Sequence, residues 1–260
     1  MSMNPYAAPK AAVADETITR GDFVPGGRTV PAGRGASWIG DAWGLFRRAP
    51  GAWIAVVIVL FVIFFVANFI PIVGPLAVMV LFPVFTGGLM IGCRELEEDR
   101  PFEFNHLFAG FRGHFGTLAA VGALYLGGYI VVMLIVMLVT GASMFAMFGA
   151  GGAPQGEDFG SLMATMGIAI LLGLALTIPL LMTVWLAAPL VVFHQQGAFD
   201  AMKGSFLGCL RNMLPFLVYG LIALVLSIVA TVPILLGWLV LGPVLAASVY
   251  TAYTDIYLNR

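Results

Sequence analysis

Long uninterrupted apolar runs dominate the pattern of hydrophobic and polar positions along this chain. A single membrane-spanning helix needs about 20 apolar residues to cross roughly 30 Å of hydrocarbon. Four stretches contain no Asp, Glu, Lys or Arg: residues 49–93, 113–156, 159–199 and 212–254. The first and fourth are long enough for two spans each. The second and third flank Glu157 and Asp158, and each provides one long span.

The pattern therefore predicts six membrane-spanning helices, near residues 51–70, 72–93, 116–147, 162–192, 213–232 and 234–254. Helices are favoured over a β-barrel because the apolar runs are continuous, whereas barrel strands alternate apolar and polar residues over about ten positions. We expect an all-α, polytopic helical membrane protein. Its six transmembrane helices are expected to form three hairpins.

Composition strengthens this expectation. Apolar residues make up 61% of the chain and charged residues 10%, and the mean hydropathy is +1.01. A soluble domain has about 45–50% apolar and about 25% charged residues, so a soluble fold of this composition could not cover its surface with polar groups. An ordinary water-soluble enzyme, a nucleic-acid binder and a disordered regulator are all excluded.

The basic residues predict the orientation. All twelve Lys and Arg residues fall in the N-terminal tail, in the loops after predicted helices 2 and 4, or at the C-terminus. The turns after predicted helices 1, 3 and 5 contain none. Cytoplasmic loops of membrane proteins are enriched in Lys and Arg, so both termini are predicted to face the cytoplasm.

Residues 1–36 precede the first apolar run and are rich in Pro, Gly and Ala. They lack the hydrophobic core of a signal peptide, so we expect an uncleaved, mostly disordered cytoplasmic tail. Residues 37–260 are expected to form the six-helix transmembrane domain. Cys93 and Cys209 lie at predicted cytoplasmic membrane edges and are expected to be reduced thiols.

A short amphipathic segment precedes each predicted hairpin, with apolar residues at steps of three and four ahead of a base. The stripes are Ile39, Trp43 and Phe46; Phe104, Leu107 or Phe108, and Phe111; and Phe199, Met202, Phe206 and Leu210. Each could be a separate amphipathic cytoplasmic helix lying in the membrane interface. The same period also fits cytoplasmic extensions of the helices that follow.

Arginines end these three segments: Arg47 and Arg48, Arg112, and Arg211. A basic side chain near an anionic membrane surface contributes about 1 kcal/mol to binding. We therefore treat these four residues as candidates for binding lipid headgroups. In the alternative interpretation they only fix the topology.

Prolines divide the second helix of each hairpin in a repeated way. The pairs are Pro71 and Pro83, Pro179 and Pro189, and Pro233 and Pro243. The first member of each pair is expected at the helix entry, where proline costs little. The inner members, Pro83, Pro189 and Pro243, each remove a backbone hydrogen bond and are predicted to kink their helices. This self-similarity indicates an internal repeat whose kinked helices could meet around a common centre.

Candidate chemistry is scarce. No Asp, Glu, Lys or Arg lies inside a predicted span, which disfavours proton- or ion-coupled transport. His106, His114 and His194 fall on the predicted cytoplasmic edge, and with the two cysteines they lack metal-ligand spacing. Motifs of zinc proteases, serine hydrolases and phosphate-binding loops are missing from the sequence. We expect no catalytic residue, cofactor or metal site, and no enzymatic activity.

Four sequence segments carry a family resemblance: MNPYAAPKAAV, GASWIGDAWGLFRRAPGAWI, FNHLFAGFRGHFGTL and GAFDAMKGSFLGCLRNMLPF. They resemble an uncharacterised family of six-span proteobacterial inner-membrane proteins. That family is similar in layout to the YciC-like proteins and to the membrane domain of some glycerophosphodiester phosphodiesterases. The resemblance covers residues 37–260 and implies a multi-pass protein of the inner membrane. It implies no activity, and hydrolysis is not carried over.

Two classes of function follow. The first is a non-enzymatic membrane component that organises lipids or partner proteins through its interfacial segments. The alternative is a passive transporter of an apolar or lipid-like substrate along the Pro-kinked helices, because a polar solute would need midplane partners that these spans scarcely provide. Membrane lipids are the expected partners and a second membrane protein is a further candidate. Nucleic acid is not expected, and the sequence does not indicate an oligomeric state.

Overall fold

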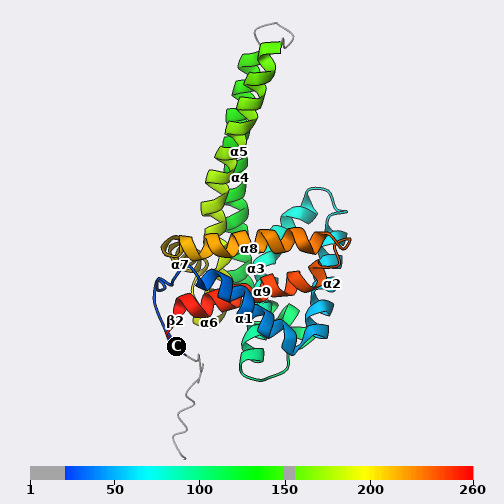
Figure 1. The fold of residues 1–260 in the computed structure, drawn as a ribbon, viewed down its shortest axis with the longest axis vertical. Helices are drawn as coiled ribbons and strands as arrows, with labels where there is room; N and C mark the ends of the chain where they lie inside the picture. The colour runs from blue at the N-terminus through cyan, green and yellow to red at the C-terminus, as the bar shows by residue number, and fades with distance from the viewer. Residues whose placement is uncertain (1–20, 149–155, 260) are drawn as a thin grey trace, which may run out of the picture.

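The computed structural model describes residues 21–148 and 156–259 (Figure 1). Apart from two short strands, its regular elements are helices. In chain order they are β1 (Asp22–Phe23), α1 (Arg34–Arg48), α2 (Pro50–Ala67), α3 (Val73–Glu97), the 3₁₀ helix η1 (Phe104–Phe111), α4 (Phe115–Phe148), α5 (Gly156–Trp185), α6 (Ala187–His194), α7 (Ala198–Arg211), α8 (Met213–Thr231), α9 (Trp238–Tyr257) and β2 (Leu258–Asn259).

Six helical segments of the described chain are long and apolar enough to cross a membrane, which confirms the predicted number. They are Pro50–Ala67, Val73–Glu97, Phe115–Ala142, Met163–His194, Met213–Thr231 and Trp238–Tyr257. The fourth differs from the expectation of one continuous helix near 162–192. It is divided at Leu186 into α5 and α6.

The six span candidates do not form one bundle of aligned helices. In Figure 1, α4 and α5 extend together away from the rest of the molecule, while α8 and α9 run across their direction. The α4–α5 pair is antiparallel, because Gly128 faces Leu180 whereas the later Val136 faces the earlier Gly173. Because this pair extends away from the rest of the molecule, it exposes apolar side chains over much of its length.

The α2–α3 and α8–α9 connections use similar tight turns. A Cβ atom added at Gly74 would overlap the Ala67 carbonyl, and one added at Gly237 would overlap the Ala230 backbone. Both turns also place a non-glycine residue at positive φ, Ile72 at 65° and Leu235 at 65°. Glycine permits the close approach of the helix ends because it has no side chain.

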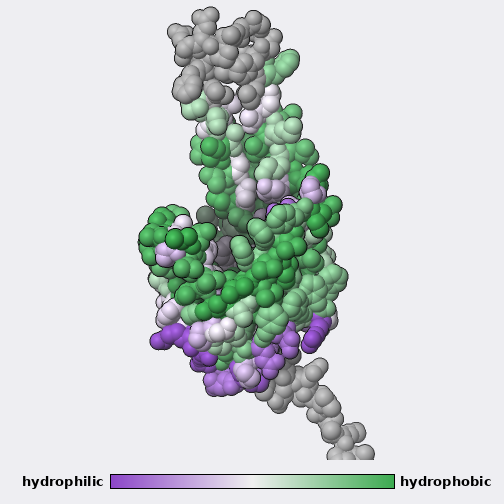
Figure 2. Space-filling view, turned by 90° about the vertical axis from the view of Figure 1, so that its right-hand side faces the viewer, coloured by the Kyte–Doolittle hydropathy of each residue, from purple (hydrophilic) through white to green (hydrophobic). Residues whose placement is uncertain are grey.

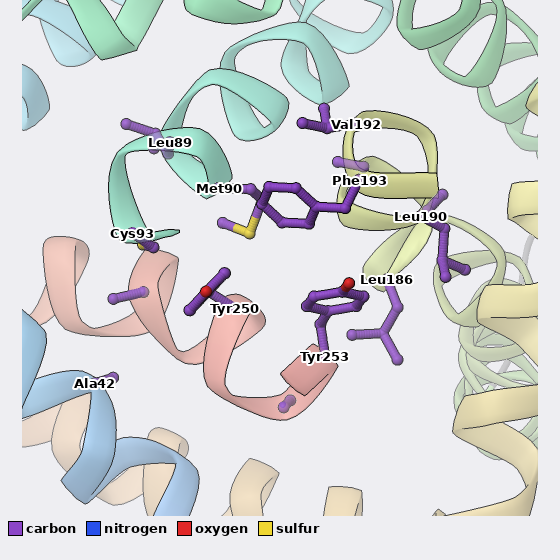
Figure 3. Close-up of a cluster of buried hydrophobic side chains, with 14 of the residues drawn as sticks. Ala42, Leu89, Met90, Cys93, Leu186, Leu190, Val192, Phe193, Tyr250 and Tyr253 are labelled. Carbon is purple, nitrogen blue, oxygen red and sulfur yellow. The ribbon is translucent and has the colours of Figure 1, made fainter. Parts of the chain in front are cut away.

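The core lies where α3, α6 and α9 meet (Figure 3). In α3, half of the apolar 18-residue segment is buried inside the molecule, and in α9 the buried share is 61%. In the other four span candidates the buried share is 17% or less. Phe193 of α6 packs against α9, with its ring centroid 6.0 Å from Tyr250 and 5.4 Å from Tyr253. Met90 of α3 lies beside them and is fully buried.

The three predicted kink residues lie in the helices that form this core. Pro83 is inside α3, Pro243 is inside α9, Pro189 is in α6, and all three are buried. The helix segments that follow them contribute side chains to the same core (Figure 3). Pro179 corrects the prediction, because it lies inside α5 rather than at a helix entry.

Ser205 of α7 satisfies the backbone where α5 ends. Its Oγ accepts a hydrogen bond from Leu186 N at 2.8 Å and donates one to Met182 O at 2.6 Å. In an unbroken helix Leu186 N would donate to Met182 O, and at this break the Ser205 hydroxyl bonds to both groups instead. A neighbouring helix thus supplies the polar contacts that hydrocarbon cannot provide.

The three segments predicted to be amphipathic, α1, η1 and α7, are separate from the helices that follow them. Ala49, at φ −146° and ψ 55°, ends α1, and Asn212, at φ −117° and ψ 34°, ends α7. Their buried faces overlap the predicted stripes only in part, at Phe46 of α1 and Leu107 of η1. In α1, Trp38 and Ala42 are buried whereas Trp43 is 42% exposed. The pattern misplaces this stripe because the protein, and not only a membrane surface, covers one side of each segment.

The α7 helix shows this most clearly. The two ends of its predicted apolar stripe point outward, with Phe199 73% exposed and Leu210 also exposed, whereas Met202 and Phe206 are half-buried. Its opposite side, with Ala201, Ser205 and Gly208, is buried against the protein. Small residues let a helix approach its neighbours closely, so this face packs inward even though it is less apolar.

We predict that Ser205→Ala lowers the free energy of unfolding by about 1–3 kcal/mol, because Leu186 N would lose its partner in a buried position. Thermal unfolding of the detergent-purified protein measures the effect. Ser227→Ala is the matched control, since Ser227 Oγ donates only to Ala223 O of its own helix. Equal stability of the two variants would contradict the role assigned to Ser205.

Candidate functional site

Hydrophilic residues gather at one end of the molecule, away from the tip of the α4–α5 pair (Figure 2). The centre of their interactions is Asp255, near the end of α9, whose side chain is 9% exposed. Asp255 Oδ2 accepts hydrogen bonds from Arg34 Nε at 2.7 Å and from Trp38 Nε1 at 2.9 Å. Oδ1 lies 3.3 Å from Arg28 Nη2. Two guanidinium groups and an indole therefore satisfy one buried carboxylate.

The same network favours the charged form of Arg34. The hydrogen bond to Asp255 raises the pKa of Arg34 above its usual value, and the nearby charges of Asp255 and Asp41 act in the same direction. Arg28 also donates from Nε to the backbone oxygen of Asp255 at 2.7 Å. Breaking a buried charge pair leaves an uncompensated charge, so the structure depends on both sides of this network.

Residues 22–33, which we call the strap, lie against the end of α9. Phe23 pairs with Leu258 in the two-stranded sheet, and Arg28 N donates to Ile256 O at 2.8 Å. The Phe23 ring also stacks on His194, with ring centroids 3.8 Å apart. The strap corrects the predicted disordered tail for residues 22–36, while residues 1–20 lie outside the described residues. Its partners are distant in sequence, so no local pattern reveals its order.

Asn212, between α7 and α8, fixes the middle of the strap. Its Oδ1 accepts a hydrogen bond from Val30 N at 2.8 Å, and its Nδ2 donates to Arg28 O and Gly208 O, both at 2.9 Å. Arg211 Nη1 donates to Gly26 O at 2.7 Å. The strap thus connects the α7–α8 junction to the end of α9.

A polar pocket of about 180 Å³ lies between α1, α3 and α9, beside the Asp255 network. Its lining residues are Arg34, Asp41, Leu45, Arg48, Glu97, Tyr250, Thr251, Thr254 and Asp255. The Tyr250 hydroxyl donates to Glu97 Oε2 at 2.6 Å. Arg34 Nη2 lies 3.6 Å from Asp41 Oδ2. The pocket therefore presents carboxylates and guanidinium groups from different helices to one small space.

The four arginines predicted to bind headgroups have different environments. Arg48 donates to Leu96 O at 2.5 Å and to Asp99 Oδ1 at 3.0 Å, and Arg211 holds the strap. Arg47 and Arg112 are exposed, and the side chain of neither forms a hydrogen bond or ion pair with the described part of the chain. Of the four, Arg47 and Arg112 are thus fully available to an external anion.

The predicted edge histidines do not come together. Nε2 of His194 lies 2.7 Å from the Tyr253 hydroxyl, and Nδ1 of His106 accepts a hydrogen bond from Glu103 N at 2.9 Å. Within the described residues, no group of three or more His, Cys, Asp or Glu side chains is placed to hold a metal ion.

Sequence reasoning missed Asp255, Trp38 and Asn212. A usable signal was present, because the charge-free stretch 212–254 begins at Asn212 and is followed at once by Asp255. A carboxylate directly at the end of an apolar span needs a partner. The sequence alone does not show that the partners are Arg28 and Arg34, more than 200 residues earlier.

We predict that Asp255→Asn lowers the free energy of unfolding by about 2–3 kcal/mol, because two guanidinium groups lose their shared carboxylate. The variant should also become more sensitive to trypsin after Arg28, since the strap loses an attachment. Thermal unfolding and limited proteolysis measure the two effects. Asp200→Asn, at an exposed position on α7, is the control, and unchanged cleavage at Arg28 would argue against the strap attachment.

Burial raises the pKa of the Cys209 thiol to about 12, although a hydrogen bond with Ser205 opposes the shift. Because the thiolate is the reactive form, we predict that Cys209 is alkylated at pH 8 at least about 100-fold more slowly in the folded protein than after denaturation. Peptide mapping by mass spectrometry distinguishes it from Cys93. An exposed thiol introduced by Asn105→Cys provides the reference rate, and an equal rate at Cys209 would contradict its burial.

Comparison with known proteins supports an assignment. No protein-family model matches this chain, and no solved structure matches it. A protein of Burkholderia thailandensis named as a "Probable inner membrane protein" is 30% identical over 207 residues, covering 76% of this chain and 75% of that protein. The six apolar helices agree with such an integral membrane protein. The chain therefore belongs to the family of this probable inner membrane protein.

Proposed function

We propose that the protein is a non-enzymatic component of the inner membrane that binds anionic lipid headgroups at its hydrophilic end. The observation that carries the proposal is that the side chains of Arg47 and Arg112 are exposed and unpaired within the described chain. An arginine whose side chain gives no hydrogen bond to its own protein keeps all five N–H donors for a phosphate. Binding of a headgroup in this way needs no catalytic residue.

Exposed aromatic rings accompany these arginines. Trp43 precedes Arg47 on α1, and Phe115 follows Arg112 at the start of α4, with 42% and 45% of their surfaces exposed. Aromatic side chains favour the boundary between headgroups and acyl chains. The outward stripe of α7, with Phe199, would enter the same boundary. Rings and bases together support a membrane-surface role for α1, η1 and α7.

The proposed orientation places both termini in the cytoplasm. Its support is the confinement of Lys and Arg to the tail, the loops after the second and fourth spans, and the C-terminus. The hydrophilic end in Figure 2 is compatible with water contact at one end of the molecule. With this orientation Arg47 and Arg112 would meet the anionic cytoplasmic leaflet.

We further propose an organisation of three hairpins, each with a preceding surface helix, and a likeness in layout to the YciC-like proteins and to the membrane domain of some glycerophosphodiester phosphodiesterases. The antiparallel α4–α5 pair and the similar turns at Gly74 and Gly237 support the hairpins. In this organisation the spans diverge, and lipid would cover their exposed sides.

The test uses the purified full chain in detergent and a short-chain phosphatidylglycerol as the anionic lipid. We predict that the double variant Arg47→Ala/Arg112→Ala raises the dissociation constant about tenfold or more, since each base contributes about 1 kcal/mol near a membrane surface. Isothermal titration calorimetry measures the constant. The thermal unfolding midpoint should stay unchanged.

Arg48→Ala is the matched control, because Arg48 bonds to Leu96 O and Asp99 within the protein. It should lower stability more than affinity. Unchanged affinity in the double variant would refute headgroup binding by these residues. Lipid scrambling or solute flux in reconstituted liposomes, without dependence on Arg47 and Arg112, would instead favour a passive transporter.

A further inference from the structure

We propose that Lys203 of α7 is a third headgroup-binding base and that, together with the exposed ring of Phe199, it makes α7 a lipid anchor of its own. The ligand is the anionic phosphate of a membrane lipid. This α7 anchor rests on the proposed function, because it adds a third base to the same kind of binding. Lys203 takes the place that the sequence assigned to Arg211, which holds the strap instead.

The α7 helix lies where such an anchor is required, at the ends of two membrane-span candidates. It connects Met163–His194 to Met213–Thr231. Leu210, near the end of α7, is exposed, and so are Met213 and Leu214 at the start of α8. Exposed apolar side chains therefore continue from α7 into a helix that hydrocarbon would cover.

Contacts on the opposite side fix the orientation of α7. Ser205 bonds to the backbone where α5 ends, and the Tyr257 hydroxyl donates to a backbone oxygen of α7 at 2.7 Å. A Cβ atom added at Gly208 would overlap the Tyr257 hydroxyl, so α7 is packed too closely against α9 to turn about its axis. Phe199 and Lys203 consequently stay on the exposed side.

The ring and the base of the α7 anchor have the same spacing as a ring and a base in α1. Phe199 precedes Lys203 by four residues, and Trp43 precedes Arg47 by four residues. Residues four apart are neighbours on the surface of a helix. All four side chains are exposed, so α7 presents the same combination of aromatic ring and base as α1.

The ammonium group of Lys203 is available to a phosphate. Its side chain forms no hydrogen bond or ion pair with the described part of the chain. An ammonium has three donors, and the lysine stem can lie along apolar surface while the charge reaches the headgroups. Among the described residues, α1, the end of η1 and α7 thus carry one unpaired base each: Arg47, Arg112 and Lys203.

Asp200, the acidic residue of α7, does not neutralise Lys203. It lies in the first turn, where the partial positive charge of the helix N-terminus favours a carboxylate. Its Oδ2 lies 3.7 Å from the position that a Cβ atom would take at Gly197, so the carboxylate is near the start of the helix. Asp200 and Lys203 form no ion pair, and the charge of the ammonium remains for an external anion.

The first test measures binding of dihexanoyl phosphatidylglycerol to the detergent-purified full chain by isothermal titration calorimetry. Lys203→Ala should raise the dissociation constant about fivefold, which is the effect of one base near a membrane surface. Lys203→Arg keeps the charge and should keep the constant. Dihexanoyl phosphatidylcholine has no net charge, so Lys203→Ala should not change its binding. An unchanged constant for phosphatidylglycerol, or an equal loss with both lipids, would overturn the proposal.

A second test asks whether the ring of the α7 anchor enters the bilayer. A spin label is attached to Phe199→Cys in the full chain, reconstituted in nanodiscs of phosphatidylglycerol and phosphatidylcholine. Electron paramagnetic resonance measures its contact with oxygen, which concentrates in hydrocarbon, and with a water-soluble nickel chelate. We expect more oxygen contact and less nickel contact than for a label at Thr29→Cys, an exposed position of the strap. Cys93 and Cys209 are buried and should remain unlabelled. Equal nickel contact at the two labelled positions would overturn the anchor.

The double variant Arg47→Ala/Arg112→Ala separates the α7 anchor from the proposed function. If it binds phosphatidylglycerol as tightly as the unchanged protein while Lys203→Ala binds more weakly, the two arginines fail as headgroup residues and the anchor stands. If the double variant loses affinity and Lys203→Ala does not, the proposed function stands and the anchor fails.

Discussion

A backbone polar group that lies in apolar surroundings must find a partner inside the protein, and the arrangement of this molecule depends on that requirement. Proline removes a hydrogen bond from a helix, and Pro83, Pro189 and Pro243 all lie in buried segments. At the break before Pro189, Ser205 provides both a donor and an acceptor. The segments after these prolines pack together, whereas the unbroken parts of the outer helices remain exposed.

The same requirement applies to charge at the hydrophilic end. Asp255 is tolerated in a buried position because Arg28, Arg34 and Trp38 all reach it. These partners bring the strap and α1 against the end of α9. The pocket beside this network is lined by residues of α1, α3 and α9, whereas Arg47 and Arg112 do not line it. The pocket and these two arginines are therefore separate parts of the surface.

The candidate site shows where local pattern ceases to be informative. The sequence predicted the same role, headgroup binding, for Arg47, Arg48, Arg112 and Arg211, because each follows an apolar stripe. Arg48 and Arg211 bond to backbone oxygens from other parts of the chain, and only contacts distant in sequence reveal this. The α1 stripe was misplaced for a similar reason, because Trp38 faces α9 and the protein interior rather than a membrane surface.

The sequence by itself determined the number and type of the apolar helices and their boundaries to within a few residues, because a hydrocarbon environment requires about 20 consecutive apolar residues and these are visible along the chain. It also located the three buried prolines. Only the tertiary structure decided that Arg48 and Arg211 bond within the chain, that residues 22–33 form a strap, and that Asp41, Glu97 and Asp255 share one pocket. Hydrogen bonds and ion pairs depend on distances between residues, and the order of residues along a chain does not contain those distances.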